Sequence, residues 1–255
     1  MENQITSRIL YCDSQCIIVN KIAGEAVEGA GKSMVDLPRL LAEELSGETW
    51  PPALPPEDKL PLPSAVHRLD VPVSGCAVFA RTNTALRLLN ETFRSSAAEK
   101  LYWAVLEKPG RQLNNALFRN GIPVTEKTEL VHWIKFDTNK NKSYACDEES
   151  PGCKKAILRC RFSGRGDNYL FMEIELISGR HHQIRAQLER LGLHIKGDLK
   201  YGAKRSERSG GIRLHARSIK FPCPDESGKC ITAQANPPIS DNLWQAFESN
   251  IQQTA

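Results

Sequence analysis

Residues 67–80 read His-Arg-Leu-Asp-Val-Pro-Val-Ser-Gly-Cys-Ala-Val-Phe-Ala and join a charged loop to an apolar run. The run over residues 76–80 is continuously apolar and follows Ser74 and Gly75, a pattern that is typical of a buried strand. Asp70 is therefore expected in a loop that a buried strand supports rigidly. A salt-bridged surface position is the more common fate of such an aspartate, so its role depends on what the rest of the chain places around it.

Short strands joined by turns dominate the pattern on both sides of this stretch. Apolar or alternating residues predict strands over residues 9–11, 16–19, 76–80, 101–106, 156–162 and 169–176. A turn over residues 163–168 makes an antiparallel hairpin of the last two strands. Strands in this order, with helices between and after them, indicate the α+β class. We expect one domain over residues 1–255, with a mixed, mostly antiparallel central sheet flanked by helices and loops.

Helical periodicity and end signals predict the helices. They are expected from Asp36 to Gly47 with Pro38 in the first turn, from Thr82 or Asn83 past Phe93, up to Leu191 before Gly192, and from about Ser240 past Ile251. Residues 50–63 hold six prolines and are expected to form no regular element. Because this segment leads directly into the 67–80 stretch, we predict a surface loop that borders the site.

Composition describes a globular protein without membrane spans. The chain has 255 residues, of which 40% are hydrophobic and 25% charged, and no segment reaches the ~20 apolar residues of a membrane helix. The N-terminal residues lack the charged and apolar regions of a signal peptide, which predicts a cytoplasmic protein. The eight cysteines are then expected as reduced thiols, and because no Cys-x-x-Cys pair occurs, we predict no zinc site.

Positive charge is concentrated in one block. The chain has a net charge of +4, but residues 180–220 contain eleven Lys or Arg against three acidic residues, a local net charge of +8 that leaves −4 elsewhere. A basic block on a nearly neutral protein is typical of a face that binds a polyanion. A solvated basic surface explains the same charges, and charge alone does not decide between the two.

Residues 176–202 carry a second dense pattern, in which a strand ends, a glycine turns the chain and a helix follows. Ile184, Leu188 and Leu191 form the predicted buried stripe of this helix. Arg185 lies roughly 100° around the helix from Ile184, beside the stripe. From that position it can direct its guanidinium along the core edge into a cleft.

Together these segments resemble the RluA-type pseudouridine synthases. Six signatures carry the resemblance, in the family's order: Ile9-Leu10-Tyr11 with Val19-Asn20-Lys21, His67-Arg68-Leu69-Asp70 with Ser74-Gly75, Lys100 with Tyr102, Ser178-Gly179-Arg180 with His182-Gln183-Ile184-Arg185, Gly197-Asp198 with Tyr201-Gly202, and Leu214-His215-Ala216. The resemblance implies a single catalytic domain of this family. It begins close to the start of the chain, so we expect no upstream accessory RNA-binding domain, which many relatives carry.

The family's reaction detaches uracil from its ribose, rotates it and rejoins it through its 5-carbon, without cofactor, metal or energy source. The resemblance implies that Asp70 is the catalytic carboxylate, either as a nucleophile on the ribose or in forming a glycal-like intermediate. It also implies that Arg185 pairs with Asp70, which suits a bidentate guanidinium. Tyr102 matches the tyrosine that stacks on the uracil and is proposed to move a proton.

The implied partner is RNA, as an rRNA or tRNA stem-loop bound by a monomer. The uridine must be flipped out of its stack at a cost of about a few kcal/mol, and Arg68 matches the position that fills the vacated stack. Ile184 would wall the uracil pocket, His67 would brace the loop and His182 would be an orienting hydrogen-bond partner. The predicted substrate-binding residues are His67, Arg68, Arg180, His182, Gln183 and Ile184.

Some positions depart from the family pattern or have simpler interpretations. The departures are Ile22, Val73, His181 and Gln187, and they put substrate choice and loop geometry in doubt. Asp198 is interpreted as a turn residue. The adjacent His181 and His182 are not expected to bind a metal, because neighbours on a helix point ~100° apart. Two other functions stay open, a non-catalytic RNA-binding or chaperone-like module and a ribonuclease that uses one of these histidines as acid and base.

Overall fold

The computed structural model divides into two compact units, which are described separately. Unit 1 comprises residues 1–99 and 216–238, and unit 2 comprises residues 100–215 and 239–255. The structure describes residues 5–29, 34–45, 58–110, 112–119, 121–208, 210–225 and 227–254. In this part of the chain no helix is long and apolar enough to cross a membrane. The expected organisation as one domain stays a prediction.

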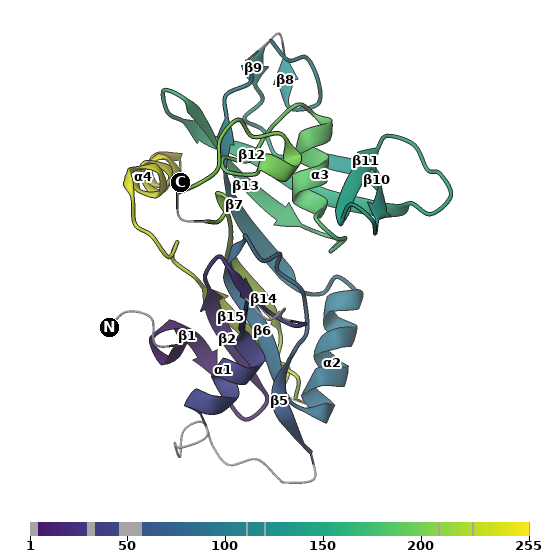
Figure 1. The fold of residues 1–255 in the computed structure, drawn as a ribbon, viewed down its shortest axis with the longest axis vertical. Helices are drawn as coiled ribbons and strands as arrows, with labels where there is room; N and C mark the ends of the chain where they lie inside the picture. Colours follow the sequence, from purple (N-terminus) through teal and green to yellow (C-terminus); the bar gives the residue numbers. More distant parts are fainter. Residues whose placement is uncertain are drawn as a thin grey trace. The chain divides into compact units, whose positions relative to one another are not determined.

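Unit 1 is a sheet with helices packed on it (Figure 1). Its elements are a short 3-10 helix (Ile5–Arg8), β1 (Ile9–Cys12), β2 (Cys16–Lys21), β3 (Glu25–Ala26), β4 (Val35–Asp36), α1 (Leu37–Glu44), β5 (Lys59–Ala65), β6 (Ser74–Thr82), α2 (Asn83–Arg94), β14 (Leu214–Pro222, which enters from unit 2) and β15 (Cys230–Gln234). The strand order is β1-β2-β6-β14, with β15 on β14 and β5 on β6. The loop that carries residues 67–73 therefore leads into β6, and the buried strand predicted over residues 76–80 lies within β6.

Local signals explain how the helices of unit 1 begin. Thr82 is the N-cap of α2, and its hydroxyl accepts a hydrogen bond from the Ala85 N–H at 3.0 Å. Asp36 caps α1 in the same way, with Pro38 in the first turn. The buried face of α2 packs with residues of β6 and β15 in one apolar cluster. The predicted helix end at Gly47 lies outside the described residues.

The predicted loop over residues 50–63 is wrong where it can be compared. β5 covers Lys59–Ala65 and pairs with β6, whereas residues 50–57 lie outside the described part. Its register shifts between Lys59 and Ser64, so Pro61 and Pro63 lie where the ladder is interrupted. Proline is tolerated in such an irregular strand because few backbone N–H groups are needed there.

Unit 2 is an antiparallel sheet with one helix on each side. Its elements are β7 (Glu99–Glu107), β8 (Phe118–Arg119), β9 (Ile122–Pro123), β10 (Thr128–Asp137), β11 (Lys142–Cys146), β12 (Lys154–Arg165), β13 (Tyr169–Leu176), α3 (Gln183–Arg190), a 3-10 helix (Leu199–Tyr201) and α4 (Asn242–Thr254). The strand order is β7-β13-β12-β10-β11, and all four neighbouring pairs are antiparallel. Together with unit 1, this confirms the α+β class.

The β12–β13 hairpin is confirmed, with a shorter turn than predicted. A register shift between Phe162 and Gly164 lets β12 continue to Arg165. Helix α4 covers this part of the sheet, where the Phe247 ring lies 4.9 Å from Trp103 and 5.1 Å from Phe171. Its cap is Asp241, one residue after the predicted Ser240, because the Asp241 carboxylate accepts the Trp244 N–H at 3.2 Å.

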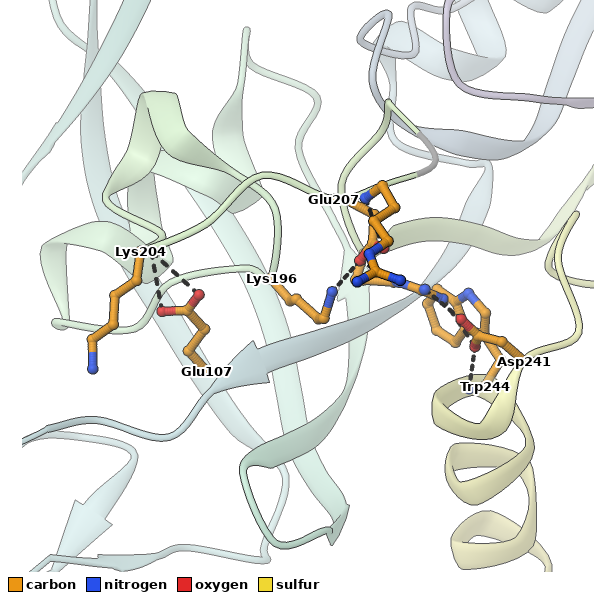
Figure 2. A network of polar contacts seen from close by, with 8 residues as sticks. Glu107, Lys196, Lys204, Glu207, Asp241 and Trp244 are labelled. Carbon is orange, nitrogen blue, oxygen red and sulfur yellow. Dashed lines mark hydrogen bonds and ion pairs between the residues drawn. The ribbon is translucent and has the colours of Figure 1, made fainter.

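A buried ion network ties α4 to the loop that precedes β14 (Figure 2). Glu207 accepts hydrogen bonds from Lys196 and, at 2.9 Å, from Arg213, and the Arg213 fork also holds Asp241. Burial alone would raise the pKa of Glu207, but the hydrogen bonds from Arg213 and Lys196 outweigh it and lower this pKa from 4.5 to about 2. The network thus stabilises unit 2 through an ionised carboxylate.

We expect a matching loss of stability in acid. A carboxyl whose pKa is lower in the folded than in the unfolded state stabilises the fold above its unfolded value, and the contribution disappears as the pH falls toward the folded value. For Glu207 the pH window runs from about 4.5 down to about 2, and the contribution is at most about 3 kcal/mol, because solvent screens part of the interaction. Urea unfolding of wild type and Glu207→Gln should therefore differ most at pH 7 and converge toward pH 2.5. A difference that does not change with pH would contradict this.

Candidate active site

Asp70 lies on a turn that a buried lysine holds together. The Lys21 side chain is fully buried at the end of β2, and its ammonium donates to the carbonyl oxygens of Asp70 at 3.3 Å, Val71 at 3.0 Å and Val73 at 2.6 Å. The Val73 N–H closes the same turn by donating to the Asp70 carbonyl at 2.9 Å. One charge thereby fixes the backbone that carries the predicted catalytic carboxylate.

The charge of Lys21 is balanced by nearby carboxylates. Burial lowers the pKa of Lys21 to about 8, and the carboxylates of Glu25 and Asp70 act against this shift. Glu25 is itself buried and takes the Arg8 fork at 2.9 and 2.8 Å. Lys21 therefore stays mostly protonated at neutral pH. Sequence reasoning included it only in a strand signature, although a lysine that ends a run of buried apolar residues signals a special role.

Gly75 allows β6 to pass very close to β14. Its φ is +113°, and a Cβ built on it would lie 2.6 Å from the backbone nitrogen of Ala216. Because a side chain has no room against a fixed backbone, only glycine fits here. The contact explains why Ser74-Gly75 and Leu214-His215-Ala216 both occur among the signatures.

Two further residues of the motif in unit 1 have contacts of their own. His67 braces the loop, because its Nε2 accepts the Val78 N–H at 3.2 Å and its ring stacks on Phe93 at 5.0 Å. Arg68 is exposed and lies 3.6 Å from the equally exposed Glu28. Such a surface pair contributes little stability, so Arg68 is available to contact a large ligand.

In unit 2, the predicted residues of the uracil pocket are buried. Tyr102 on β7 is 5% exposed and pairs with Ile174 of β13, and Ile184 in the first turn of α3 is 4% exposed. Arg185, also on α3, is 5% exposed. A buried guanidinium needs a carboxylate to offset the loss of hydration.

Asp198 supplies such a carboxylate for Arg185. The interpretation of Asp198 as a turn residue alone is therefore incomplete. Arg185 donates to Asp198 through Nε at 2.7 Å and Nη2 at 2.8 Å, and Asp198 is 1% exposed. The Arg185 guanidinium also lies 4.7 Å over the Tyr201 ring. Asp198 does form a turn, since its carbonyl accepts the Tyr201 N–H at 3.0 Å. The turn brings its side chain back to α3, which the spacing alone does not reveal.

The start of α3 differs from the expected helix. His182 is the N-cap, with a left-handed φ of 51°, so it precedes the helix and does not belong to it. The His181 and His182 rings therefore stack 3.8 Å apart, and the 100° separation assumed for them was wrong. His182 Nδ1 lies 2.9 Å from the Tyr201 hydroxyl, and its orienting role toward the substrate stays a prediction. In the described part of the chain no group of metal-ligating side chains occurs.

Gln183 and Arg180 brace the backbone in this structure. The Gln183 carbonyl oxygen accepts from the Ser178 hydroxyl at 2.9 Å and the Arg180 N–H at 3.0 Å, and its amide donates to the Ile157 carbonyl at 3.0 Å. Arg180 is exposed and its Nε donates to the Lys155 carbonyl at 3.0 Å. Gln183 thus positions the turn before α3, and a direct substrate contact stays a prediction for both residues.

Two of the departures from the family pattern fill the interior. Gln187 is fully buried on α3, and its amide lies 2.9 Å from His132 Nδ1 and 3.3 Å from the Leu130 carbonyl of β10. Val73 is 2% exposed, and its own backbone carbonyl is one of those that Lys21 binds.

The Cys160 thiol lies in the core of unit 2. Burial raises the pKa of this thiol to about 12, so it stays protonated at neutral pH.

The comparison with known families decides the assignment. A family model described as RNA pseudouridylate synthase matches residues 15–190, a range that contains Asp70, Tyr102 and Arg185. This chain belongs to the RNA pseudouridylate synthase family. The resemblance to the RluA-type enzymes is thereby confirmed, and the protein is an isomerase that acts on uridine in RNA.

Relatives of this pseudouridylate synthase cover nearly the whole chain. An uncharacterised RNA pseudouridine synthase of Zymomonas mobilis is 29% identical over 91% of this chain and 94% of its own length. The ribosomal large subunit pseudouridine synthase D of Neisseria meningitidis is 28% identical over 92% of this chain but 59% of its own length. The human RNA pseudouridylate synthase domain containing 4 superposes with a TM-score of 0.66 at 19% identity, over 97% of this chain and 94% of that structure, which shows the shared fold.

Proposed function

We propose that this protein converts specific uridines of structured RNA, either rRNA or tRNA, to pseudouridine with Asp70 as the catalytic carboxylate. The observation that carries the proposal is the turn that begins at Asp70, the last residue of the His-Arg-Leu-Asp motif. The buried Lys21 ammonium fixes this turn by binding its backbone carbonyls. Catalysis by a positioned group requires such rigidity. Relatives named for the large ribosomal subunit favour rRNA as the substrate.

The proposed reaction conserves the composition of the uridine but exchanges one hydrogen with solvent. The bond from N1 to the ribose C1′ breaks and a bond from C5 to C1′ forms, while C5 loses its hydrogen to solvent and N1 gains a proton. Asp70 acts on the ribose, Tyr102 stacks on the uracil and Ile184 walls the pocket. The Arg185 fork supports Asp70, and this pairing joins residues of the two units and stays a prediction. A guanidinium has five donors, of which Asp198 takes two.

Release of the C5 hydrogen gives a direct test. RNA labelled with tritium at C5 of uridine should lose tritium to water when incubated with the purified protein, while the RNA chain stays intact. The ribonuclease alternative predicts cleavage of the chain. Its acid and base would have to be His181 or His182, whose Nδ1 atoms are already engaged by Ser143 at 2.9 Å and Tyr201 at 2.9 Å. A protein that only binds RNA would release no tritium.

The structure distinguishes two kinds among nine of the eleven cations of the basic block, while Arg180 and Arg217 donate to backbone carbonyls. Five of the eleven form ion pairs with carboxylates: Arg185, Arg190, Lys196, Arg213 and Lys220. Across the described ranges, Lys200, Lys204, Arg205 and Arg208 form no ion pair and are exposed. The Lys204 backbone is fixed by the Glu107 carboxylate at 3.2 Å. These exposed cations are the proposed phosphate contacts, because each can replace a counterion of the RNA.

Neutralising three of these cations should weaken the salt dependence of RNA binding. For the variant Lys204→Ser/Arg205→Ser/Arg208→Ser, we expect the slope of log Kd against log salt for a labelled stem-loop RNA to fall by about 2, because each lost phosphate contact removes ~0.7–0.9. The control is Arg87→Ser/Arg94→Ser/Lys229→Ser, which removes the same charge from exposed positions of unit 1. An equal change of slope in both variants would contradict the assignment.

A further inference from the structure

The inner face of β10 ends in an exposed aromatic ring. Every second residue of β10 points to this face. Of these residues, Leu130, His132 and Ile134 are at most 6% exposed, but Phe136, the next one along, is 43% exposed. It lies opposite Ser143 of β11, close to the turn of the hairpin. A single exposed apolar side chain is common on protein surfaces, so the groups around Phe136 decide whether its ring has a role.

Phe136 is the outer end of a row of rings. Its ring centre lies 4.2 Å from that of His181, and the His181 ring stacks at 3.8 Å on His182. Buried groups fix the row: the Ser143 hydroxyl lies 2.9 Å from His181 Nδ1, and Tyr201, 2.9 Å from His182 Nδ1, is 1% exposed. His182 has a left-handed backbone conformation, with a φ of 51°, in the position where its ring stacks on His181. The rings are therefore held in place before any ligand arrives.

Positive charge borders the outer end of the row. Lys200 donates to the Asn141 carbonyl at 3.0 Å in the hairpin turn, and Lys140 in the same turn is exposed. The acid in this turn is Asp137, whose carboxylate accepts the Lys140 backbone N–H at 3.1 Å. A flat aromatic surface with cations beside it suits a planar, uncharged ring that is attached to an anionic group, which describes a nucleobase and its phosphate.

We propose that Phe136, backed by His181, is a stacking platform for a nucleobase from a single-stranded part of the RNA. This inference rests on the proposed function for the nature of the ligand. Stacking on aromatic side chains is how proteins commonly hold splayed RNA bases.

The base on this platform is not the one that reacts. Tyr102, the predicted neighbour of the reacting uracil, lies on β7, and β13 and β12 separate β7 from β10. Three strand spacings of ~4.8 Å place the two strands roughly 14 Å apart. Tyr102 is also buried, whereas Phe136 is exposed. The platform therefore holds a second nucleotide, and it acts in binding and substrate choice.

Binding of two RNA probes to the full chain tests the proposal. Labelled decauridine offers single-stranded bases, and a blunt ten-base-pair RNA duplex offers none. Phe136→Leu keeps an apolar side chain but removes the ring, and it should weaken decauridine binding about tenfold while duplex binding stays unchanged. Phe136→Trp should retain or strengthen decauridine binding. The matched control Val131→Ala changes a residue of the same strand that is 37% exposed on the opposite face and should leave both affinities unchanged.

Each outcome separates the platform from the isomerase. Equal decauridine binding by wild type and Phe136→Leu overturns the platform, as does an equal loss for both probes. A loss in Phe136→Trp as large as that in Phe136→Leu also overturns it, because the ring is then irrelevant. If decauridine binding depends on the ring but wild type releases no tritium from labelled RNA, the platform stands and the isomerase proposal fails. If wild type binds neither probe, the platform is overturned, while tritium release from structured RNA still decides the isomerase proposal.

Discussion

Asp70→Asn is expected to abolish tritium release from C5-labelled RNA, with a fall in rate of about 10⁴-fold or more, as removal of a central catalytic group typically causes. The substitution keeps the shape of the side chain but removes the negative charge that acts on the ribose. The turn itself should survive, because Lys21 binds the backbone carbonyl of Asp70. RNA binding should therefore persist, which separates loss of chemistry from loss of structure.

The control for this variant is Asp167→Asn, which removes an exposed aspartate from the β12–β13 turn. It should leave the rate and the RNA affinity unchanged. Substantial turnover by Asp70→Asn would sink the assignment of the catalytic carboxylate. If the wild-type protein itself has no turnover while both variants bind RNA equally, the chaperone-like alternative is the better description.

Asp198→Asn is expected to destabilise the protein by about 3 kcal/mol, because it removes the negative charge that accepts two hydrogen bonds from the buried Arg185 guanidinium. Both side chains are at most 5% exposed and joined by two hydrogen bonds. The control is Asp147→Asn, which breaks the exposed pair with Arg190 at the other end of α3 and should cost less than ~1 kcal/mol. Urea unfolding measures both effects, and equal losses would contradict the burial argument.

Arg185→Lys separates the structural part of this pair from the catalytic one. A lysine keeps the positive charge, but its ammonium cannot make the bidentate contact of a guanidinium. The charge is therefore displaced from the position that the Arg185 guanidinium occupies. We expect turnover to fall by about 10²-fold under conditions in which unfolding experiments show the variant to be folded. Near-normal turnover would refute the proposed support of Asp70 by Arg185 and leave a purely structural role.

The parts of the fold that short-range signals determine could be predicted from the sequence. Thr82 caps α2 because its hydroxyl reaches an N–H three residues ahead, and the β12–β13 hairpin follows from two alternating strands around a polar turn. β10 shows the same alternation and could have been found, although it was not assigned. β5 was missed because its prolines argue against a strand unless the interrupted register is known.

The site is harder to predict because its supporting contacts join distant residues. The Lys21 ammonium reaches carbonyls 49 to 52 positions further along the chain, and Arg185 finds Asp198 13 positions away through a turn. The proposed catalytic residues Asp70, Tyr102 and Arg185 follow from the motifs, whereas the residues that position them do not. The resemblance identifies residue types at signature positions but not which side chain each of them contacts.

Pseudouridine mapping in living cells tests the central claim most directly. The complete pseudouridine maps of rRNA and tRNA would be compared between cells that carry the wild-type gene and cells whose only copy encodes Asp70→Asn. We predict that pseudouridine disappears from one or a few uridines while the remaining sites and the RNA levels stay unchanged. Identical maps in the two strains would contradict the proposal that this protein isomerises cellular RNA through Asp70.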